Sequence, residues 1–235
     1  MKKFICLSLA CLIGATSVAV LSGCNDGNST VKPGYVIEAT EPDLKDGDFG
    51  FFILDQNQLI ATKYSGNETD IVIPDSYDNY TVSAIGNSMF ISSKIESVTM
   101  PDTVTKIGDY SFASCSQLKN VKLAKEIKSL GSNAFFNCPK LDSIELPEGI
   151  EDLGVYSLAG TGIKTVTIPK SVTELKESVF FQCRNLEEVY LPGTLTNIRE
   201  DCFSQCSSNL TIKAPSGSYA ESYAKENNFK FEATE

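Results

Sequence analysis

The chain has no histidine and no tryptophan among its 235 residues. Without histidine it lacks the commonest general base, the commonest metal ligand and every Ser-His-Asp or Cys-His arrangement. Basic residues are also few: 20 Lys and Arg stand against 30 Asp and Glu, which gives a net charge of −10. Such a surface repels a phosphate backbone, which argues against nucleic acid as a partner. Because phosphate-binding loops and nucleophile elbows are missing too, the sequence predicts a protein that is not an enzyme and binds no cofactor.

The one long apolar run lies at the amino terminus. Lys2 and Lys3 precede an uncharged stretch over residues 4–21, and Leu21-Ser22-Gly23-Cys24 ends it. A basic start followed by an apolar run is typical of a secretory signal peptide, and small residues directly before a cysteine resemble a bacterial lipoprotein signal. The resemblance implies cleavage after residue 23, a lipid on Cys24, and an exported protein that reaches the membrane through this lipid alone and is displayed at the cell surface. A secreted protein with an unmodified Cys24 is the alternative.

Removal of residues 1–23 takes Lys2 and Lys3 away, so the net charge falls from −10 to −12. Residues 24–48 are acidic and lack apolar periodicity, which is typical of a flexible tether. The rest of the chain, residues 49–235, is then expected to form one domain.

This domain is built from repeats. Short Val-x-Leu-like segments end at seven anchor positions whose successive spacings are 27, 23, 23, 22, 23 and 23 residues. The anchors are Pro74, Pro101, Ala124, Pro147, Pro169, Pro192 and Pro215. Alternation before each anchor predicts a strand of about three residues, and proline ends it because it has no N–H to donate. Such strands are expected to stack in parallel about 4.8 Å apart.

The remainder of each repeat indicates the structure of the side opposite the strands. In the clearest copy, Ile107, Phe112, Cys115 and Leu118 are spaced by five, three and three residues, which suits a short helical or 3₁₀ turn. Four phenylalanines occupy one repeat position and are expected to stack as a buried column. They are Phe112, Phe135, Phe180 and Phe203. The sequence thus predicts an α/β repeat solenoid with a parallel sheet on one face and helical turns opposite.

These residues also carry a resemblance. The pattern Ile-Pro-x-x-Val-x-x-Ile-Gly-x-x-x-Phe-x-x-Cys-x-x-Leu-x-x-Val-x-Leu is similar to the repeat of BspA-like leucine-rich-repeat proteins, over roughly residues 49–235. The resemblance implies a surface protein that adheres to host matrix proteins or to other bacteria, with a protein as its partner. A glycan-binding accessory lipoprotein of an uptake system is the alternative, although glycan binding favours aromatic platforms.

Both ends of the array are predicted to be covered. Residues 49–54 and 59–64 alternate around Asp55-Gln56-Asn57, which indicates a hairpin before the first coil. At the other end Ser216 or Ser218 can cap a helix whose apolar face is Tyr219, Ala220, Tyr223 and Ala224. A final strand is expected after this helix.

Five cysteines remain once Cys6, Cys11 and Cys24 are set aside: Cys115, Cys138, Cys183, Cys202 and Cys206. All but Cys202 share one repeat position and are expected to form a ladder of buried small side chains. Neighbouring coils bring such positions within disulfide range, so Cys115–Cys138 and Cys183–Cys206 bonds remain an alternative to free thiols. With no histidine and no second Cys-x-x-Cys, no metal site is expected.

The candidate binding face is the outward strand column. Its members are Val72, Thr99, Lys122, Glu145, Thr167, Tyr190 and Lys213. Seven three-residue strands about 4.8 Å apart offer roughly 340 Å², less than the about 800 Å² per partner of a standard interface. Neighbouring turns must therefore contribute, and the insertion with Tyr77 and Tyr80 is the favoured extension because tyrosine is a common anchor at interfaces.

Overall fold

The computed structural model describes residues 41–55 and 57–234. Pro42–Glu235 form one compact unit. The predicted signal peptide, Cys24 and most of the tether lie outside the described residues.

The compact unit begins earlier than the sequence indicated. Residues 44–46, which we assigned to the tether, form strand β1 (Leu44–Asp46), and this strand pairs antiparallel with β2 (Phe49–Asp55). The Asp43 carboxylate accepts a hydrogen bond from the Ile53 backbone N–H, and Leu44 packs against the core. One partly buried leucine among acidic residues carries no periodicity, which is why this strand escaped the sequence analysis.

The predicted hairpin is present as β2 and β3 (Gln58–Tyr64), which pair antiparallel. β3 then pairs in parallel with β6 (Tyr80–Ile85), the first strand of the repeat array on that side. The two-residue strand β5 (Ser76–Tyr77) pairs antiparallel with β6.

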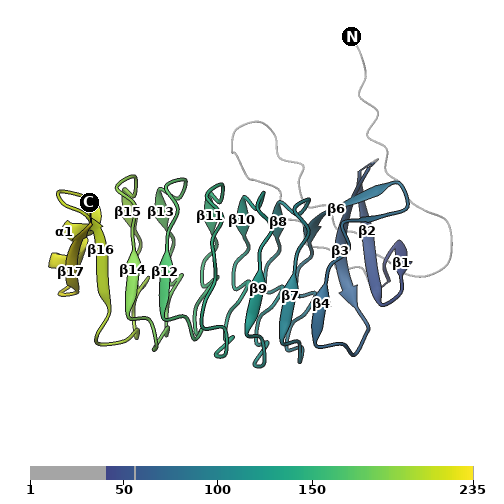
Figure 1. Cartoon of the computed structure of the whole chain (residues 1–235), viewed down its shortest axis with the longest axis horizontal. Coiled ribbons are helices and arrows are strands. Elements are labelled where there is room, and N and C mark those ends of the chain that lie inside the picture. The colour runs from purple at the N-terminus through teal and green to yellow at the C-terminus, as the bar shows by residue number, and fades with distance from the viewer. Residues whose placement is uncertain (1–40, 56, 235) are drawn as a thin grey trace, which may run out of the picture. The chain divides into compact units, whose positions relative to one another are not determined.

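The array that follows is a β-solenoid with two rows of strands (Figure 1). The first row, which we call the strand face, consists of β4 (Asp70–Val72), β7 (Ser97–Thr99), β9 (Asn120–Lys122), β12 (Thr165–Thr167), β14 (Glu188–Tyr190), β16 (Thr211–Pro215) and β17 (Lys230–Thr234). The second row, which we call the second side, continues from β6 through β8 (Lys106–Ile107), β10 (Ser129–Leu130), β11 (Asp152–Leu153), β13 (Glu174–Leu175) and β15 (Asn197–Ile198). The sequence analysis anticipated the first row and missed the second.

The strand face is interrupted, contrary to the expected continuous sheet. It divides into a three-stranded sheet, β4-β7-β9, and a four-stranded sheet, β12-β14-β16-β17. Residues 143–146, which include Glu145, form no strand between them. The coil that starts there is the one with the 22-residue spacing, and its missing residue lies between Leu158 and Val166.

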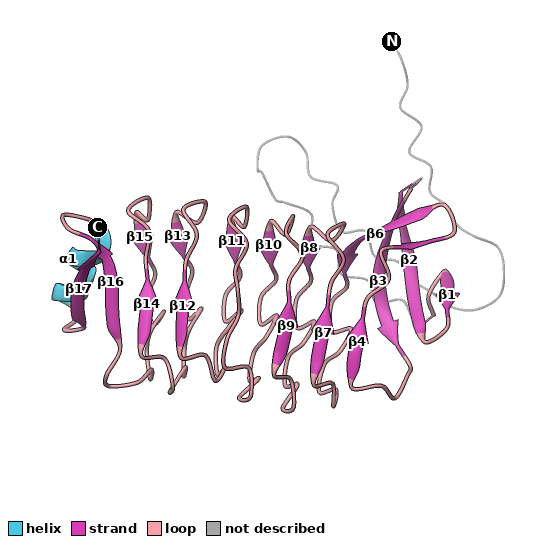
Figure 2. Cartoon of the chain, viewed as in Figure 1, coloured by secondary structure: helices cyan, strands magenta, loops and turns pink. Residues whose placement is uncertain are grey.

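The third side of each coil consists of turns and not of the helical segments that we expected (Figure 2). Every coil from residue 88 onward places two residues with left-handed φ four positions apart, for example Tyr110 and Ser114, or Asn133 and Asn137. A left-handed residue every four positions prevents a right-handed helix from continuing. Turn bonds such as Ala113 N–H to the Tyr110 carbonyl hold this side together, and we call it the turn side.

The core runs through the array as columns of equivalent side chains. Phe112 and Phe135 stack with ring centroids 5.1 Å apart, and Phe180 and Phe203 with centroids 5.6 Å apart. Leu158 stands in the same column on the coil between these pairs and is fully buried. The repeat register read from the sequence therefore places these side chains in one core.

A column of glycines lies beside the second side. Its members are Gly86, Gly108, Gly131 and Gly154. A Cβ on Gly131 would meet the Gly108 carbonyl carbon at 2.4 Å, so coils approach through bare backbone here. Lys176 and Arg199 occupy this position in the next two coils, and the pairing of the second side stops between β11 and β13.

One helix is present among the described residues, α1 (Tyr219–Glu226), with Ser218 as N-cap. Ala220 and Ala224 are buried, and Tyr223 lies 6.3 Å from the Phe203 ring. β17 follows and pairs in parallel with β16. At eight residues α1 is too short to span a membrane, and the described part of the chain contains no longer apolar helix.

Candidate binding surfaces

The predicted face residues fall into two groups. Thr99 and Lys122 are paired positions of β7 and β9, and Thr167, Tyr190 and Lys213 are paired positions of β12, β14 and β16. Glu145 lies between the groups, exposed and outside any strand. The structure therefore offers two short patches in place of one column.

Tyr190 and Lys213 are engaged with their neighbours. The Lys213 ammonium lies 2.8 Å from Glu188 and 3.2 Å from Glu232, and 5.2 Å from the centre of the Tyr190 ring. The Tyr190 hydroxyl donates to Glu188 at 3.0 Å. The hydrogen bonds that the Lys213 ammonium donates to Glu188 and then to Glu232 raise the pKa of Lys213, and its side chain is only 17% exposed. A partner would meet a fixed network here and not free side chains.

Tyr77 and Tyr80 lie away from the strand face. They belong to β5 and β6 on the second side, and both are half-buried against the core. The Tyr77 ring stacks on Phe51 with centroids 6.0 Å apart. The structure does not join these tyrosines to the predicted column.

The turn side carries an aromatic cluster that the sequence analysis missed. Phe136, Tyr156 and Phe181 come from three successive coils and are partly exposed. Tyr156 stands edge-on to both neighbours, 6.3 Å from Phe136 and 5.8 Å from Phe181. Tyr110, at the position of Tyr156 two coils earlier, is 45% exposed. We call Tyr110, Phe136, Tyr156 and Phe181 the aromatic ridge.

A sequence signal for the ridge existed in the Phe135-Phe136 and Phe180-Phe181 pairs. The first member of each pair fills the buried column. Since neighbouring residues of a tight turn cannot both point into that column, the second must lie at the surface. Polar side chains follow the ridge residues along the turns, among them Asn137, Gln182 and Arg184.

The cysteines act as hydrogen-bond donors inside the array. All five described cysteines are free. Four thiols donate to a carbonyl of the preceding coil's core column: Cys115 to Phe90, Cys138 to Phe112, Cys183 to Leu158 and Cys206 to Phe180, at 2.9–3.2 Å. Burial raises the pKa of Cys115 to about 11 and of Cys138 to about 12. These thiols are therefore poor nucleophiles and poor metal ligands.

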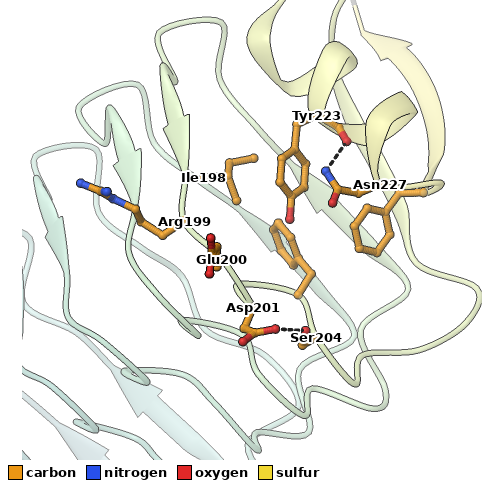
Figure 3. Close-up of a pocket in the computed structure, with 9 residues that line it drawn as sticks. Ile198, Arg199, Glu200, Asp201, Ser204, Tyr223 and Asn227 are labelled. Atoms are coloured by element: carbon orange, nitrogen blue, oxygen red, sulfur yellow. Dashed lines mark hydrogen bonds between the residues drawn. The ribbon is translucent and has the colours of Figure 1, made fainter.

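A shallow cavity of about 440 Å³ lies between the last complete coil and α1 (Figure 3). Its wall combines Tyr223 and Asn227 with the charged run Arg199, Glu200 and Asp201. Asp201 accepts a hydrogen bond from the Ser204 hydroxyl at 2.6 Å. The described residues contain no group of three His, Cys, Asp or Glu side chains placed to hold a metal ion.

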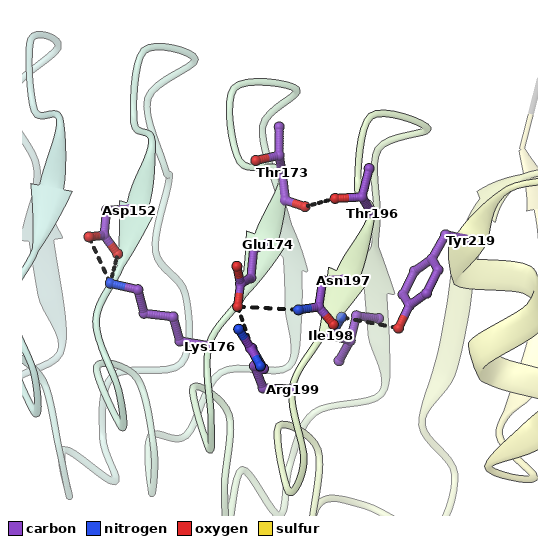
Figure 4. Close-up of polar contacts among 9 residues, drawn as sticks. All are labelled: Asp152, Thr173, Glu174, Lys176, Thr196, Asn197, Ile198, Arg199 and Tyr219. Atoms are coloured by element: carbon purple, nitrogen blue, oxygen red, sulfur yellow. Dashed lines mark hydrogen bonds and ion pairs between the residues drawn. The ribbon is translucent and has the colours of Figure 1, made fainter.

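Side-chain pairs connect successive coils along the second side (Figure 4). Lys176 bridges to Asp152 at 2.6 Å, and Glu174 accepts from both Arg199 and Asn197. The Thr196 hydroxyl donates to the Thr173 carbonyl at 3.1 Å. These groups are therefore engaged with a neighbouring coil on this side.

Residues 83–213 match the family model of the BspA-type leucine-rich repeat region, in six copies. The chain belongs to this family. Nothing in the BspA-type repeat fold or in the described residues indicates catalysis. No curated protein sequence matches the chain significantly.

Solved structures of other bacterial proteins show a similar fold. The leucine-rich repeat protein of T. pallidum is 20% identical and superposes with a TM-score of 0.63, over 80% of this chain and 97% of that one. A leucine-rich repeat protein from Bacteroides ovatus is 24% identical with a TM-score of 0.59, over 74% of this chain and 56% of that one. The pneumococcal vaccine antigen PcpA is 16% identical with a TM-score of 0.59, over 83% of this chain and half of its own length.

Proposed function

We propose that this protein is a non-enzymatic adhesion module that binds a protein partner at a bacterial surface, anchored by a lipid on Cys24. Leucine-rich repeat proteins generally bind proteins, and the chain belongs to a family associated with surface binding. The apolar run followed by Leu-Ser-Gly-Cys supports export and anchoring. The tether between Cys24 and β1 then holds the solenoid away from the membrane.

The aromatic ridge is the observation that carries this proposal. Four large rings lie on the turns of four successive coils, on a scaffold with continuous core columns. Tyrosine and other aromatic side chains supply contact area at low entropic cost, and serine, asparagine and arginine beside them supply adaptable hydrogen bonds. The turns that carry the ridge have this composition.

The strand face is the second proposed contact surface. Thr99 and Lys122 offer one patch, and Thr167, Tyr190 and Lys213 another, with Glu145 between them. Tyr77 and Tyr80 are proposed as a separate contact on the second side. Each of these patches is smaller than a standard interface, so many anchored copies on one cell would strengthen weak single contacts.

A glycan partner is the second candidate function. The ridge supplies the aromatic platform that the strand column lacks, and amide side chains such as Asn137 and Gln182 could bind sugar hydroxyls. The protein-binding reading ranks first because of the family.

The two candidates separate in a cell-adhesion assay. Cells that display the full chain are tested on immobilised host matrix and on bacterial cells, each left untreated, treated with protease, or oxidised with periodate. We expect adhesion to survive periodate and to disappear after protease treatment. Loss after periodate alone would assign a glycan partner instead, and cells without the chain are the control.

A further inference from the structure

The interface between the coil of residues 143–164 and the coil of residues 165–187 differs from the other coil interfaces. Between residues 97–119 and 120–142, for example, strands pair on the strand face and on the second side, and turns pair on the turn side. Between residues 120–142 and 143–164 the strand face has no pair, but β10 and β11 still pair on the second side. Between the coils of residues 143–164 and 165–187, within the described residues, no strand pair forms on either strand row. Backbone hydrogen bonds cross on the turn side there, and the other two sides are joined by the side chains of Ser171 and Lys176.

The open strand face leaves apolar side chains partly uncovered. Val121, Leu123 and Leu146 are partly exposed. Their equivalents Val98, Met100, Ile168 and Leu191 in other coils are 1–4% exposed. The coils around residues 143–146 therefore pack less closely on this side than elsewhere.

The opening on the second side has a steric cause. Gly154 approaches Gly131 so closely that a Cβ would lie 2.5 Å from the Gly131 carbonyl carbon. The next coil places Lys176 at this position, where a Cβ excludes the close approach that the glycines make. In the coil after it Arg199 stands opposite Lys176 and β13 pairs with β15, so the opening lies where the column changes from glycine to a larger residue. Lys176 spans this opening with its ion pair to Asp152 at 2.6 Å, where the other coils have backbone pairing.

The turn side holds the two coils together. The Leu158 N–H donates to the Val179 carbonyl at 3.1 Å, and the Gly160 N–H to the Phe181 carbonyl at 2.8 Å. The rings of Tyr156 and Phe181 meet edge-on above these bonds. A contact with backbone hydrogen bonds along one side, and only side-chain bonds along the other two, has the geometry of a hinge.

Ion pairs lie within each stack, and among the described residues Asp152–Lys176 is the one ion pair that crosses between them. Glu96–Lys119 and Asp102–Lys125 connect coils before the interface, and Glu188–Lys213 connects coils after it. Each stack is thus tied internally. Away from the turn side, the two stacks are joined by side-chain bonds: the Lys176–Asp152 ion pair and the Ser171 hydroxyl, which donates to the Glu148 carbonyl at 2.7 Å.

We propose that the solenoid is two rigid stacks, residues 42–164 and 165–234, joined by a hinge at the turns beneath Tyr156 and Phe181. The ridge crosses this hinge, with Tyr110, Phe136 and Tyr156 on one stack and Phe181 on the other. Bending changes the distance between the two strand sheets most and the distance between the ridge rings least. A partner that contacts both sheets would select one hinge angle, whereas a partner on the ridge tolerates several.

Spin-label distances on the full chain test the hinge. The pairs Lys125→Cys with Lys170→Cys and Asp102→Cys with Glu148→Cys both join equivalent positions two coils apart, and only the first pair crosses the hinge. We expect a broad distance distribution for the first pair and a narrow one for the second. Equally narrow distributions would overturn the hinge. Unsubstituted protein, in which four of the five described thiols are buried and Cys206 is partly buried, serves as the labelling control.

Two substitutions at one position test its cause. Lys176→Gly restores the glycine column and should narrow the distribution across the hinge, because β11 and β13 can then pair. Lys176→Ala removes the same ion pair but keeps the Cβ, so its distribution should stay broad or widen. If both variants gave the same distribution, the steric origin of the hinge would be wrong.

Discussion

A Cβ on Gly154 would lie 2.5 Å from the carbonyl carbon of Gly131, so these two glycines let neighbouring coils meet through backbone alone. Real Cβ atoms do not approach so closely, and the clash involves backbone that cannot rotate away. Glycine at this repeat position therefore sets the distance between neighbouring coils. This holds only for the coils that have the glycine, from Gly86 to Gly154.

Gly131→Ala is expected to destabilise the protein by about 2–3 kcal/mol, because overpacked sites must shift backbone. Gly193→Ala is the matched control: its Cβ would meet only a Pro215 carbon at 3.5 Å, an ordinary contact. We expect the control to change stability by less than about 0.5 kcal/mol. Urea unfolding of the two variants measures the difference in their free energies of unfolding. Equal losses of stability would contradict the close backbone approach at Gly131.

Phe180→Ala is expected to cost roughly 3–5 kcal/mol, because it leaves a cavity in the stacked column. Lys122→Ala, on the exposed strand face, should change stability by less than about 0.5 kcal/mol. Denaturant titrations of both variants provide the comparison. Similar effects would mean that the repeat register is misassigned.

The ladder thiols are expected to be free and slow to react. Mature native protein should label little with a thiol reagent, and unfolded, unreduced protein should show the five free cysteines of the structure. A single reactive thiol after unfolding would show that Cys115–Cys138 and Cys183–Cys206 disulfides had formed. The count is read by mass spectrometry.

Stability should fall in alkali because of these thiols. Burial raises the pKa of Cys138 from 9.0 to about 12. The unfolded chain releases this proton above about pH 9 while the folded chain keeps it, so folding weakens between pH 9 and 12, by up to about 1.4 kcal/mol per pH unit for this thiol. In urea titrations at pH 7.5, 9 and 10, the free energy of unfolding should fall less with pH for Cys138→Ala than for the natural protein. If it fell equally in both proteins, the raised pKa of Cys138 would be wrong.

Much of the array was predictable because its signal is local and repeated. The proline anchors gave the strand register, and the spacing of Phe112, Phe135, Phe180 and Phe203 placed one side chain per coil in the core. The hairpin of β2 and β3 and the helix α1 followed from alternation and from the Ser218 cap. None of these inferences needed knowledge of long-range packing.

The rest depends on contacts that a single sequence does not display. Tyr110, Ser114 and Ser178 carry no mark of the left-handed conformation that turns their segments away from helix. The 22-residue spacing was visible, but the loss of strand pairing at residues 143–146 emerges only when coils are stacked. The two-residue strands of the second side are too short for periodicity to reveal.

Cys24→Ala is expected to leave an unprocessed or released protein, because the anchor depends on lipid at this thiol. Cell fractionation followed by mass determination of the amino terminus measures the outcome. If the variant were cleaved after residue 23 and still fractionated with membranes, the lipid anchor would be wrong. Lys45→Cys, on the short exposed strand β1, is a control that should leave anchoring unchanged.

The most direct test of the binding surface compares three strains at matched surface levels of the full chain. One displays the natural chain, one carries Tyr110→Ser, Phe136→Ser and Phe181→Ser on the ridge, and one carries Thr99→Ala, Lys122→Ala and Thr167→Ala on the strand face. Circular dichroism of the purified variants first verifies folding. We expect the ridge variant to lose more than about tenfold in adhesion to protein-coated surfaces, since anchors of this type carry most of the binding energy, and the strand-face variant to retain most of it. Full adhesion by a folded ridge variant would contradict the proposal that these rings bind the partner.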